Sequence, residues 1–273
     1  MPRYVIPLAV GLVLLAGWVR AAEESHVRAR LVADQVGPGL SRTGVVGVHF
    51  VMETGWHIYW KNPGDAGLAT AVDFAMPDGF EVGELRWPAP IAFTQPGDLV
   101  AYGYEGSVVL SAEVTAPVTW SGEPRTLTAS VSWLACKEVC VLGSAELKSE
   151  WPLAPSPDVF DDSGSRLPGP NGPFELSVTG GLGPGDRRGR VSLWLEWNEP
   201  PGEVQFFPGA DNGLKITDAR TQTRGRLTRI DFSASLIGGG EAVNHVPSVV
   251  TATDAGGGRT GWLLNAPLRA MNQ

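Results

Sequence analysis

Short runs in which apolar and polar residues alternate make up much of this chain. Two clear examples are residues 126–133, "TLTASVSW", and residues 190–197, "RVSLWLEW". The apolar positions are Leu127, Ala129, Val131 and Trp133 in the first run and Val191, Leu193, Leu195 and Trp197 in the second. Because successive side chains of a β-strand point to opposite faces of a sheet, this period of two predicts strands with one buried face.

The same alternation recurs along the chain, with turn residues between the runs. Further strand-like runs are residues 26–33, 44–52, 106–114, 174–180, 226–236 and 246–253. Long helical periodicity is absent from the sequence, and Gly (35) and Pro (22) are frequent. Many short strands without crossover helices are typical of antiparallel sheets packed face to face. We therefore predict an all-β fold with two immunoglobulin-like β-sandwich domains.

A proline-rich stretch interrupts the strand pattern near the middle of the chain. Six prolines fall within residues 152–173, among acidic residues and glycines, and leave little apolar surface to pack. We predict a linker over residues 153–172. A first domain over 24–152 would contain both cysteines, and a second sandwich over 173–273 would contain none. Each has roughly the 100-residue length of an immunoglobulin-like sandwich.

The N-terminus has the layout of a secretory signal peptide. Arg3 precedes an apolar run over residues 5–19, and the small residue Ala21 precedes the acidic "EES". The run is shorter than the roughly 20 residues that a membrane-spanning helix needs. We predict a signal peptide over residues 1–21 and a protein that is periplasmic or otherwise exported and soluble after cleavage.

The charge balance excludes some partners. Without residues 1–21 the chain has 19 Lys and Arg residues against 29 Asp and Glu residues, a net charge of −10. Nucleic acids and anionic membrane surfaces are poor partners for such a protein. The sequence also lacks a phosphate-binding loop, a Ser-His-Asp set and a paired-carboxylate motif.

The chemistry of the chain centres on its two cysteines, Cys136 and Cys140, in "WLACKEVC". If Cys136 ends one strand and Cys140 begins the next, residues 137–139 form a three-residue hairpin loop. Residues that face each other across a hairpin have Cα atoms about 4.5–5.5 Å apart, and a disulfide accepts about 4.4–6.8 Å. A disulfide can therefore form, and export to an oxidising compartment favours it.

The spacing of the two cysteines leaves three roles open. A bridge across so short a loop stabilises a fold by only about 2 kcal/mol, which weakens a purely structural role. Redox exchange suits a tight, reducible bridge. A Cu(I) site is the third possibility, with Cys136, Cys140, His57 and Met52 as ligands. The sequence has no second cysteine pair to complete a structural zinc site.

Four blocks around these cysteines resemble a known family. Residues 55–70, 85–93, 101–110 and 133–147 together are similar to the exported N-terminal domain of the DsbD-type thiol:disulfide interchange proteins, most nearly to its ScsB branch, named for suppression of copper sensitivity. Residues 204–216 and the strands after them resemble the second, cysteine-free sandwich of that branch. The resemblance implies an immunoglobulin-like domain in which Cys136 and Cys140 are a redox-active pair.

The resemblance also implies how the pair is shielded. In this family aromatic side chains and a cap loop cover the cysteines, and the cap loop falls within about residues 91–104 here. The implied supporting or shielding residues are Trp56, His57, Tyr59, Phe93, Tyr102 and Tyr104. For Trp56, the residue type favours an ordinary place in the core. His57 is a candidate for proton transfer, because histidine titrates near neutral pH.

The implied activity is that of a protein-disulfide reductase type of thiol–disulfide oxidoreductase, without a cofactor. Family members receive electrons from a membrane-embedded domain and pass them to exported thiol proteins. This sequence ends at Gln273 with neither the membrane domain nor the thioredoxin-like domain of full-length members. We therefore expect a separate membrane thiol reductase as electron donor and exported disulfide-containing proteins as acceptors. A copper-binding or copper-tolerance role for the same cysteines is the alternative.

Overall fold

The protein is almost entirely β-structure, in antiparallel sheets. The structure, a computed structural model, describes residues 26–34, 42–161, 166–183, 185–209, 213–237 and 245–268. Within these ranges the strands form four sheets and the single helix, α1 (Pro157–Phe160), is one turn long. The all-β prediction is therefore confirmed. The predicted signal peptide, residues 1–21, lies outside the described residues.

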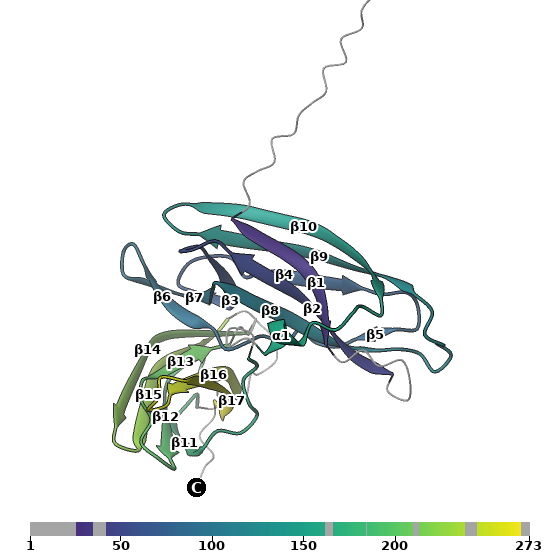
Figure 1. Cartoon of the computed structure of the whole chain (residues 1–273). Coiled ribbons are helices and arrows are strands. Elements are labelled where there is room, and N and C mark those ends of the chain that lie inside the picture. The colour runs from purple at the N-terminus through teal and green to yellow at the C-terminus, as the bar shows by residue number, and fades with distance from the viewer. Residues whose placement is uncertain are drawn as a thin grey trace, which may run out of the picture.

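Two sheets come from the N-terminal part of the chain (Figure 1). The first has the order β1-β2-β8-β5, formed by β1 (Val27–Asp34), β2 (Thr43–Met52), β8 (Ser107–Thr115) and β5 (Glu81–Val82). The second has the order β10-β9-β3-β7-β6, formed by β10 (Cys140–Trp151), β9 (Arg125–Cys136), β3 (His57–Gly64), β7 (Leu99–Glu105) and β6 (Ile91–Gln95). The short strand β4 (Ala71–Ala75) pairs with the middle of β9.

Two further sheets come from the C-terminal part of the chain. One has the order β11-β12-β15-β14, formed by β11 (Phe174–Gly180), β12 (Arg188–Trp197), β15 (Leu227–Leu236) and β14 (Leu214–Arg224). The other has the order β13-β16-β17, formed by β13 (Val204–Pro208), β16 (His245–Thr253) and β17 (Arg259–Pro267). In Figure 1 these strands lie together at one end of the N-terminal sheets.

The alternating residues of the sequence form the cores between facing sheets. Leu127, Ala129, Val131 and Trp133 of β9 are all buried, as are Val191, Leu193, Leu195 and Trp197 of β12. Both runs were predicted to bury these faces, and both predictions are confirmed. One apolar cluster joins strands of the two N-terminal sheets, and another joins strands of the two C-terminal sheets. Each pair of sheets therefore packs face to face.

The two parts of the chain also share buried contacts. The N-terminal cluster takes in Phe207 of β13 and Val249 of β16, and the rings of Trp60 and Phe207 meet edge to face at 6.4 Å. The proline-rich stretch contacts both parts, through bridges from Pro155 to Ala33 and from Gly169 to Trp262. The domain boundaries at 24–152, 153–172 and 173–273 stay a prediction.

Strand β3 is the structural basis of the site described next. Its residues His57 to Trp60 are all buried, because the strand lies between β9 and β7 and both of its faces are covered. Ile58 and Trp60 point into the main N-terminal cluster. His57 and Tyr59 point to the opposite face, since side chains alternate along a strand.

Candidate functional site: a disulfide beneath a β-hairpin

Cys136 and Cys140 form a disulfide at the tip of the β9–β10 hairpin. Cys136 is the last residue of β9 and Cys140 is the first of β10, and the two are direct partners in the ladder. Their Cα atoms are 4.1 Å apart, and the Lys137 N–H donates to the Val139 carbonyl at 3.0 Å. The three-residue loop predicted for residues 137–139 is therefore confirmed.

The two cysteines differ in exposure. Cys136 is only 2% exposed, whereas Cys140 is exposed to solvent. The cause is topological, because β9 lies inside the sheet and β10 is its edge strand. Cys136 packs in a small cluster with Tyr59 and Ala101, against which Phe93 and Leu134 also pack. A reagent from solution therefore meets Cys140 first.

His57 lies directly opposite Cys136 in the β3–β9 ladder. Directly opposite residues in antiparallel strands point to the same face and have neighbouring side chains. Tyr59, two residues further along β3, points to this face as well and packs with Cys136. The sequence placed His57 and Tyr59 beside the pair only through the family resemblance, and the structure brings both to it.

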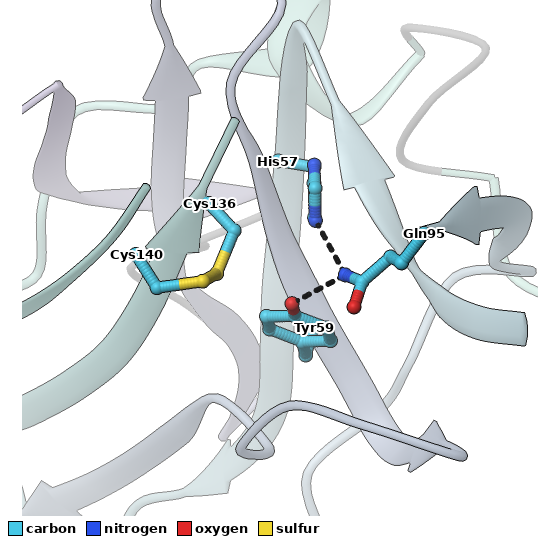
Figure 2. Close-up of a disulfide and its surroundings, with 5 residues drawn as sticks. All are labelled: His57, Tyr59, Gln95, Cys136 and Cys140. Atoms are coloured by element: carbon cyan, nitrogen blue, oxygen red, sulfur yellow. Dashed lines mark hydrogen bonds between the residues drawn. A yellow bond between two sulfur atoms is a disulfide. The ribbon is translucent and has the colours of Figure 1, made fainter. Parts of the chain in front are cut away.

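A second hairpin continues the sheet beside β3 and covers this face with its side chains. We call residues 91–105, which comprise β6, β7 and the turn between them, the cover hairpin. The Phe93 ring stacks on the His57 imidazole, with ring centres 4.5 Å apart. Figure 2 shows Gln95 reaching His57 and Tyr59 from the side opposite to the disulfide. The cover hairpin therefore encloses the polar groups next to Cys136.

Gln95 joins the two polar side chains of the site. Its amide Nε2 donates to the Tyr59 hydroxyl at 2.7 Å and lies 3.3 Å from Nε2 of His57 (Figure 2). With the amide donating to both, His57 Nε2 is an acceptor and the imidazole proton is on Nδ1. Burial lowers the pKa of His57 below 6.5, because the charged form is poorly solvated there. The site therefore contains a neutral imidazole at neutral pH.

This shift predicts a pH-dependent stability. As the pH falls below about 6.5, the unfolded chain protonates His57 while the folded protein does not. The unfolded state then binds more protons, so the free energy of unfolding falls with pH until the lowered pKa of the folded state is passed. We expect urea denaturation between pH 8 and pH 5 to show a smaller loss of stability in His57→Gln than in the wild type. Parallel curves for the two proteins would contradict this assignment.

Three aromatic residues that the resemblance implied as shields lie elsewhere. Tyr102 and Tyr104 alternate with Ala101 on β7 and so point away from the disulfide cluster. Tyr102 packs against Phe207 instead, and the Tyr104 hydroxyl donates to the Pro88 carbonyl at 2.8 Å. Trp56 belongs to the main core and stacks on His26, as its residue type favoured. Of the cap-loop aromatics named from the sequence, Phe93 is the one in the disulfide cluster.

The oxidised site gives little support to the alternative of a Cu(I) site. Met52 is buried in the main N-terminal cluster, separate from the small cluster that holds Cys136. Both sulfurs are joined in the disulfide and offer no thiolate. Among the described residues, no three His, Cys, Asp or Glu side chains are grouped so as to hold a metal ion. Copper binding by the reduced protein stays a prediction.

Sequence reasoning missed Gln95 and two leucines beside the cysteines. Leu134 and Leu142 pair across the ladder two residues from Cys136 and Cys140, so all four share one face. Leu142 is 66% exposed, and Val139 in the loop is 63% exposed. The sequence did contain a signal for the two leucines. Once the cysteine hairpin is assumed, a residue two positions from a cysteine along its strand lies on the same face as that cysteine. Gln95 had no such signal, since its contacts come from tertiary packing.

A comparison with protein families identifies the part of the chain that carries this site. Residues 33–151 match the family described as thiol:disulfide interchange protein DsbD, N-terminal. Residues 33–151 are a DsbD-type N-terminal domain. The resemblance predicted from the sequence is thereby confirmed. This DsbD-type domain includes the disulfide, His57, Tyr59 and the cover hairpin.

The fold also matches a solved structure over nearly the whole chain. The N-terminal periplasmic domain of ScsB from Proteus mirabilis is similar with a TM-score of 0.62 and 17% sequence identity, covering 93% of this chain and 98% of that one. At this identity the likeness shows the fold alone. No curated protein sequence matches the chain. Within the described ranges, no helix has the length and apolar character needed to cross a membrane.

Proposed function

We propose that this chain is an exported thiol–disulfide interchange protein that works through Cys136 and Cys140. The observation that carries the proposal is the placement of the disulfide. It lies at a hairpin tip with one exposed and one buried cysteine, within a DsbD-type domain. A purely structural disulfide needs no such difference in exposure. Thiol–disulfide exchange needs it, because a partner must reach one sulfur while the other is kept from solvent.

The chemistry follows from the exposure of each sulfur. A donor thiolate attacks Cys140 Sγ, the Cys136–Cys140 bond breaks, and Cys136 leaves as a thiolate that takes up a proton. The second donor thiol resolves the mixed disulfide, so two electrons reach the pair and the donor becomes a disulfide. In the second half-cycle the Cys140 thiolate attacks an acceptor disulfide. Cys136 then attacks Cys140, which restores the bridge and releases the reduced acceptor.

His57 is the group we assign to the proton of Cys136. It lies opposite Cys136 in the ladder and is neutral at neutral pH, so its Nε2 can accept the proton of the Cys136 thiol once the Gln95 amide releases that nitrogen. In the oxidised structure Tyr59 and Gln95 hold the imidazole in one orientation, with the shared amide on Nε2. Phe93 limits the access of water to this side of the pair.

The partners and the arrangement of the chain complete the proposal. A membrane thiol reductase would donate the electrons, and exported proteins with disulfides would accept them. Export itself would depend on the predicted signal peptide at residues 1–21. We assign the redox activity to a domain over residues 24–152, joined by residues 153–172 to a second sandwich domain over 173–273.

A redox titration tests the function. The oxidised protein is equilibrated with mixtures of reduced and oxidised glutathione, and the fractions of bridged and reduced Cys136/Cys140 are measured by mass spectrometry after acid quenching. We expect a midpoint between about −300 and −120 mV, the range of working exchange proteins. A midpoint well below about −300 mV would show a structural bridge and would overturn the proposal.

Leu142 is expected to support the docking of protein partners. Its exposed side chain shares a face with Cys140, so a protein that reaches the sulfur also covers the leucine. In Leu142→Ser we expect reduction by reduced thioredoxin to slow about fivefold, which corresponds to a contact of about 1 kcal/mol. Reduction by dithiothreitol should not change. The matched control is Leu227→Ser, at an exposed leucine in the C-terminal sheets. Equal rates of reduction by thioredoxin in Leu142→Ser and Leu227→Ser would show that Leu142 is not part of the docking surface.

A further inference from the structure

The cover hairpin is held by the pairing of β7 with β3 and, at the start of β6, by contacts of the three residues before it. Pro88, Ala89 and Pro90 lead directly into β6. The two prolines have no N–H group, so this segment is held largely through its carbonyl oxygens. All three carbonyls accept hydrogen bonds from side chains, Pro88 from the Tyr104 hydroxyl and Ala89 and Pro90 from Arg259.

Arg259 reaches this segment from the C-terminal part of the chain. It is the first residue of β17, some 170 positions away in sequence. One guanidinium nitrogen donates to the Ala89 carbonyl at 3.3 Å, and the other donates to the Pro90 carbonyl. Among the described residues, no carboxylate forms an ion pair with Arg259. Glu203 acts on this half-buried cation electrostatically without forming an ion pair, and the side-chain hydrogen bonds of Arg259 go to the two carbonyls at the base of the cover hairpin.

Phe207 extends the same contact to the other strand of the hairpin. The Arg259 guanidinium lies over the Phe207 ring, 5.6 Å from its centre. The Phe207 ring and the ring of Tyr102 on β7 meet edge to face, with ring centres 5.3 Å apart. Arg259 and Phe207 thus contact the segment that enters β6 and the outward face of β7. The inward face of the same hairpin carries Phe93, Gln95 and Ala101, which surround His57, Tyr59 and Cys136.

We propose that Arg259 is a positioning residue, through which the C-terminal sheets fix the cover hairpin over Cys136 and so restrict thiol chemistry to Cys140. The inference rests on the proposed function for its biological meaning. The inference itself concerns only the access of reagents to the Cys136 sulfur. It gives the cysteine-free part of the chain a role in the selectivity of the cysteine pair.

The direct test measures the access to Cys136. In a Cys140→Ala background, the Cys136 thiol is alkylated with iodoacetamide in native buffer, and the rate is followed by mass spectrometry. We expect Arg259→Ala to raise this rate about tenfold, because two hydrogen bonds from a charged donor are lost. Arg259→Lys should give an intermediate rate, since an ammonium group keeps the charge without the planar fork. An unchanged rate in Arg259→Ala would overturn the proposal.

Two controls separate positioning from a general loss of stability. Arg226→Ala removes an arginine that pairs with Glu196 within the C-terminal sheets and should leave the rate unchanged. Leu195→Ala weakens the C-terminal core without touching the contacts of Arg259 and should also leave it unchanged. A rise in Leu195→Ala equal to that in Arg259→Ala would overturn the inference.

A second measurement uses the intact disulfide. The oxidised protein is exposed briefly to reduced glutathione and quenched with acid, and the cysteine that carries glutathione is mapped. We expect Cys140 alone to be modified in the wild type and both cysteines in Arg259→Ala. Modification of Cys140 alone in both proteins would contradict the proposal. Neither measurement needs a protein partner, so a failure of the proposed function in the redox titration would be seen separately.

Discussion

Replacing Cys136 with alanine is expected to turn the protein into a trap for its redox partners. The remaining Cys140 is exposed at the start of the edge strand β10, so its thiolate can attack a partner disulfide. The mixed disulfide then persists, because the buried resolving cysteine is missing. Multiple turnover with a disulfide substrate should fall to the background rate. Non-reducing electrophoresis and mass spectrometry would detect a covalent complex through Cys140.

The reciprocal variant supplies the matched control. Cys140→Ala leaves one cysteine that is 2% exposed beneath the cover hairpin. We expect it to lose turnover as completely but to yield at least about tenfold less mixed disulfide, the factor given by a difference of about 1.4 kcal/mol in the barrier to attack. Equal yields from the two variants would contradict the assignment of Cys140 as the attacking residue. No complex from either variant would argue against interchange itself.

The second large effect is expected at Gly67, which lies against the Tyr59 ring. Its φ angle is 111°, and a Cβ placed there would lie 2.2 Å from Cε1 of the buried Tyr59 ring. Gly67→Ala must therefore adopt a strained backbone and displace Tyr59 from Gln95. We expect the free energy of unfolding to fall by about 2–5 kcal/mol, as backbone strain and overpacking together imply. Urea denaturation followed by tryptophan fluorescence would measure it.

Gly122 separates the two causes of that loss. Its φ angle is 99°, close to that of Gly67, but no atom lies within 4 Å of the position that a Cβ would occupy. Gly122→Ala should lose only the backbone contribution, about 1–3 kcal/mol. Equal losses from the two variants would mean that Tyr59 moves aside at no cost. A larger loss in Gly67→Ala would show that the Tyr59 ring is held firmly in place.

The sequence predicts strands well where one face is buried and the other meets water. The alternation in β9 and β12 marks their buried residues because solvent covers part of their other face. The cysteine hairpin was also predictable, since a three-residue loop brings its flanking residues within reach of a disulfide, although the observed Cα distance of 4.1 Å is shorter than the expected range of about 4.5–5.5 Å. In β3 the alternation is hidden, because the residues from His57 to Trp60 are all buried, on two different faces. Which of them faces the cysteines is decided by the neighbouring strands.

Contacts between distant segments account for what the sequence does not reveal. Tyr102 and Tyr104 are aromatic and lie in the right segment, but the pleat of β7 turns them away from Cys136 and turns Ala101 toward it. Gln95 and Arg259 have no local pattern that marks them. Their partners lie 36 and about 170 positions away, so their roles depend on the packing of whole sheets.

The short span of the disulfide bears on how the protein changes between its two redox states. The bridge joins residues four positions apart that already face each other in a ladder of two 12-residue strands. Opening it releases only a small loop, so little chain entropy is gained and the hydrogen bonds of β9 and β10 remain. The oxidised and reduced forms should therefore have nearly the same backbone. Electron transfer through this pair then proceeds with small structural reorganisation, and the same surface is presented to donor and acceptor alike.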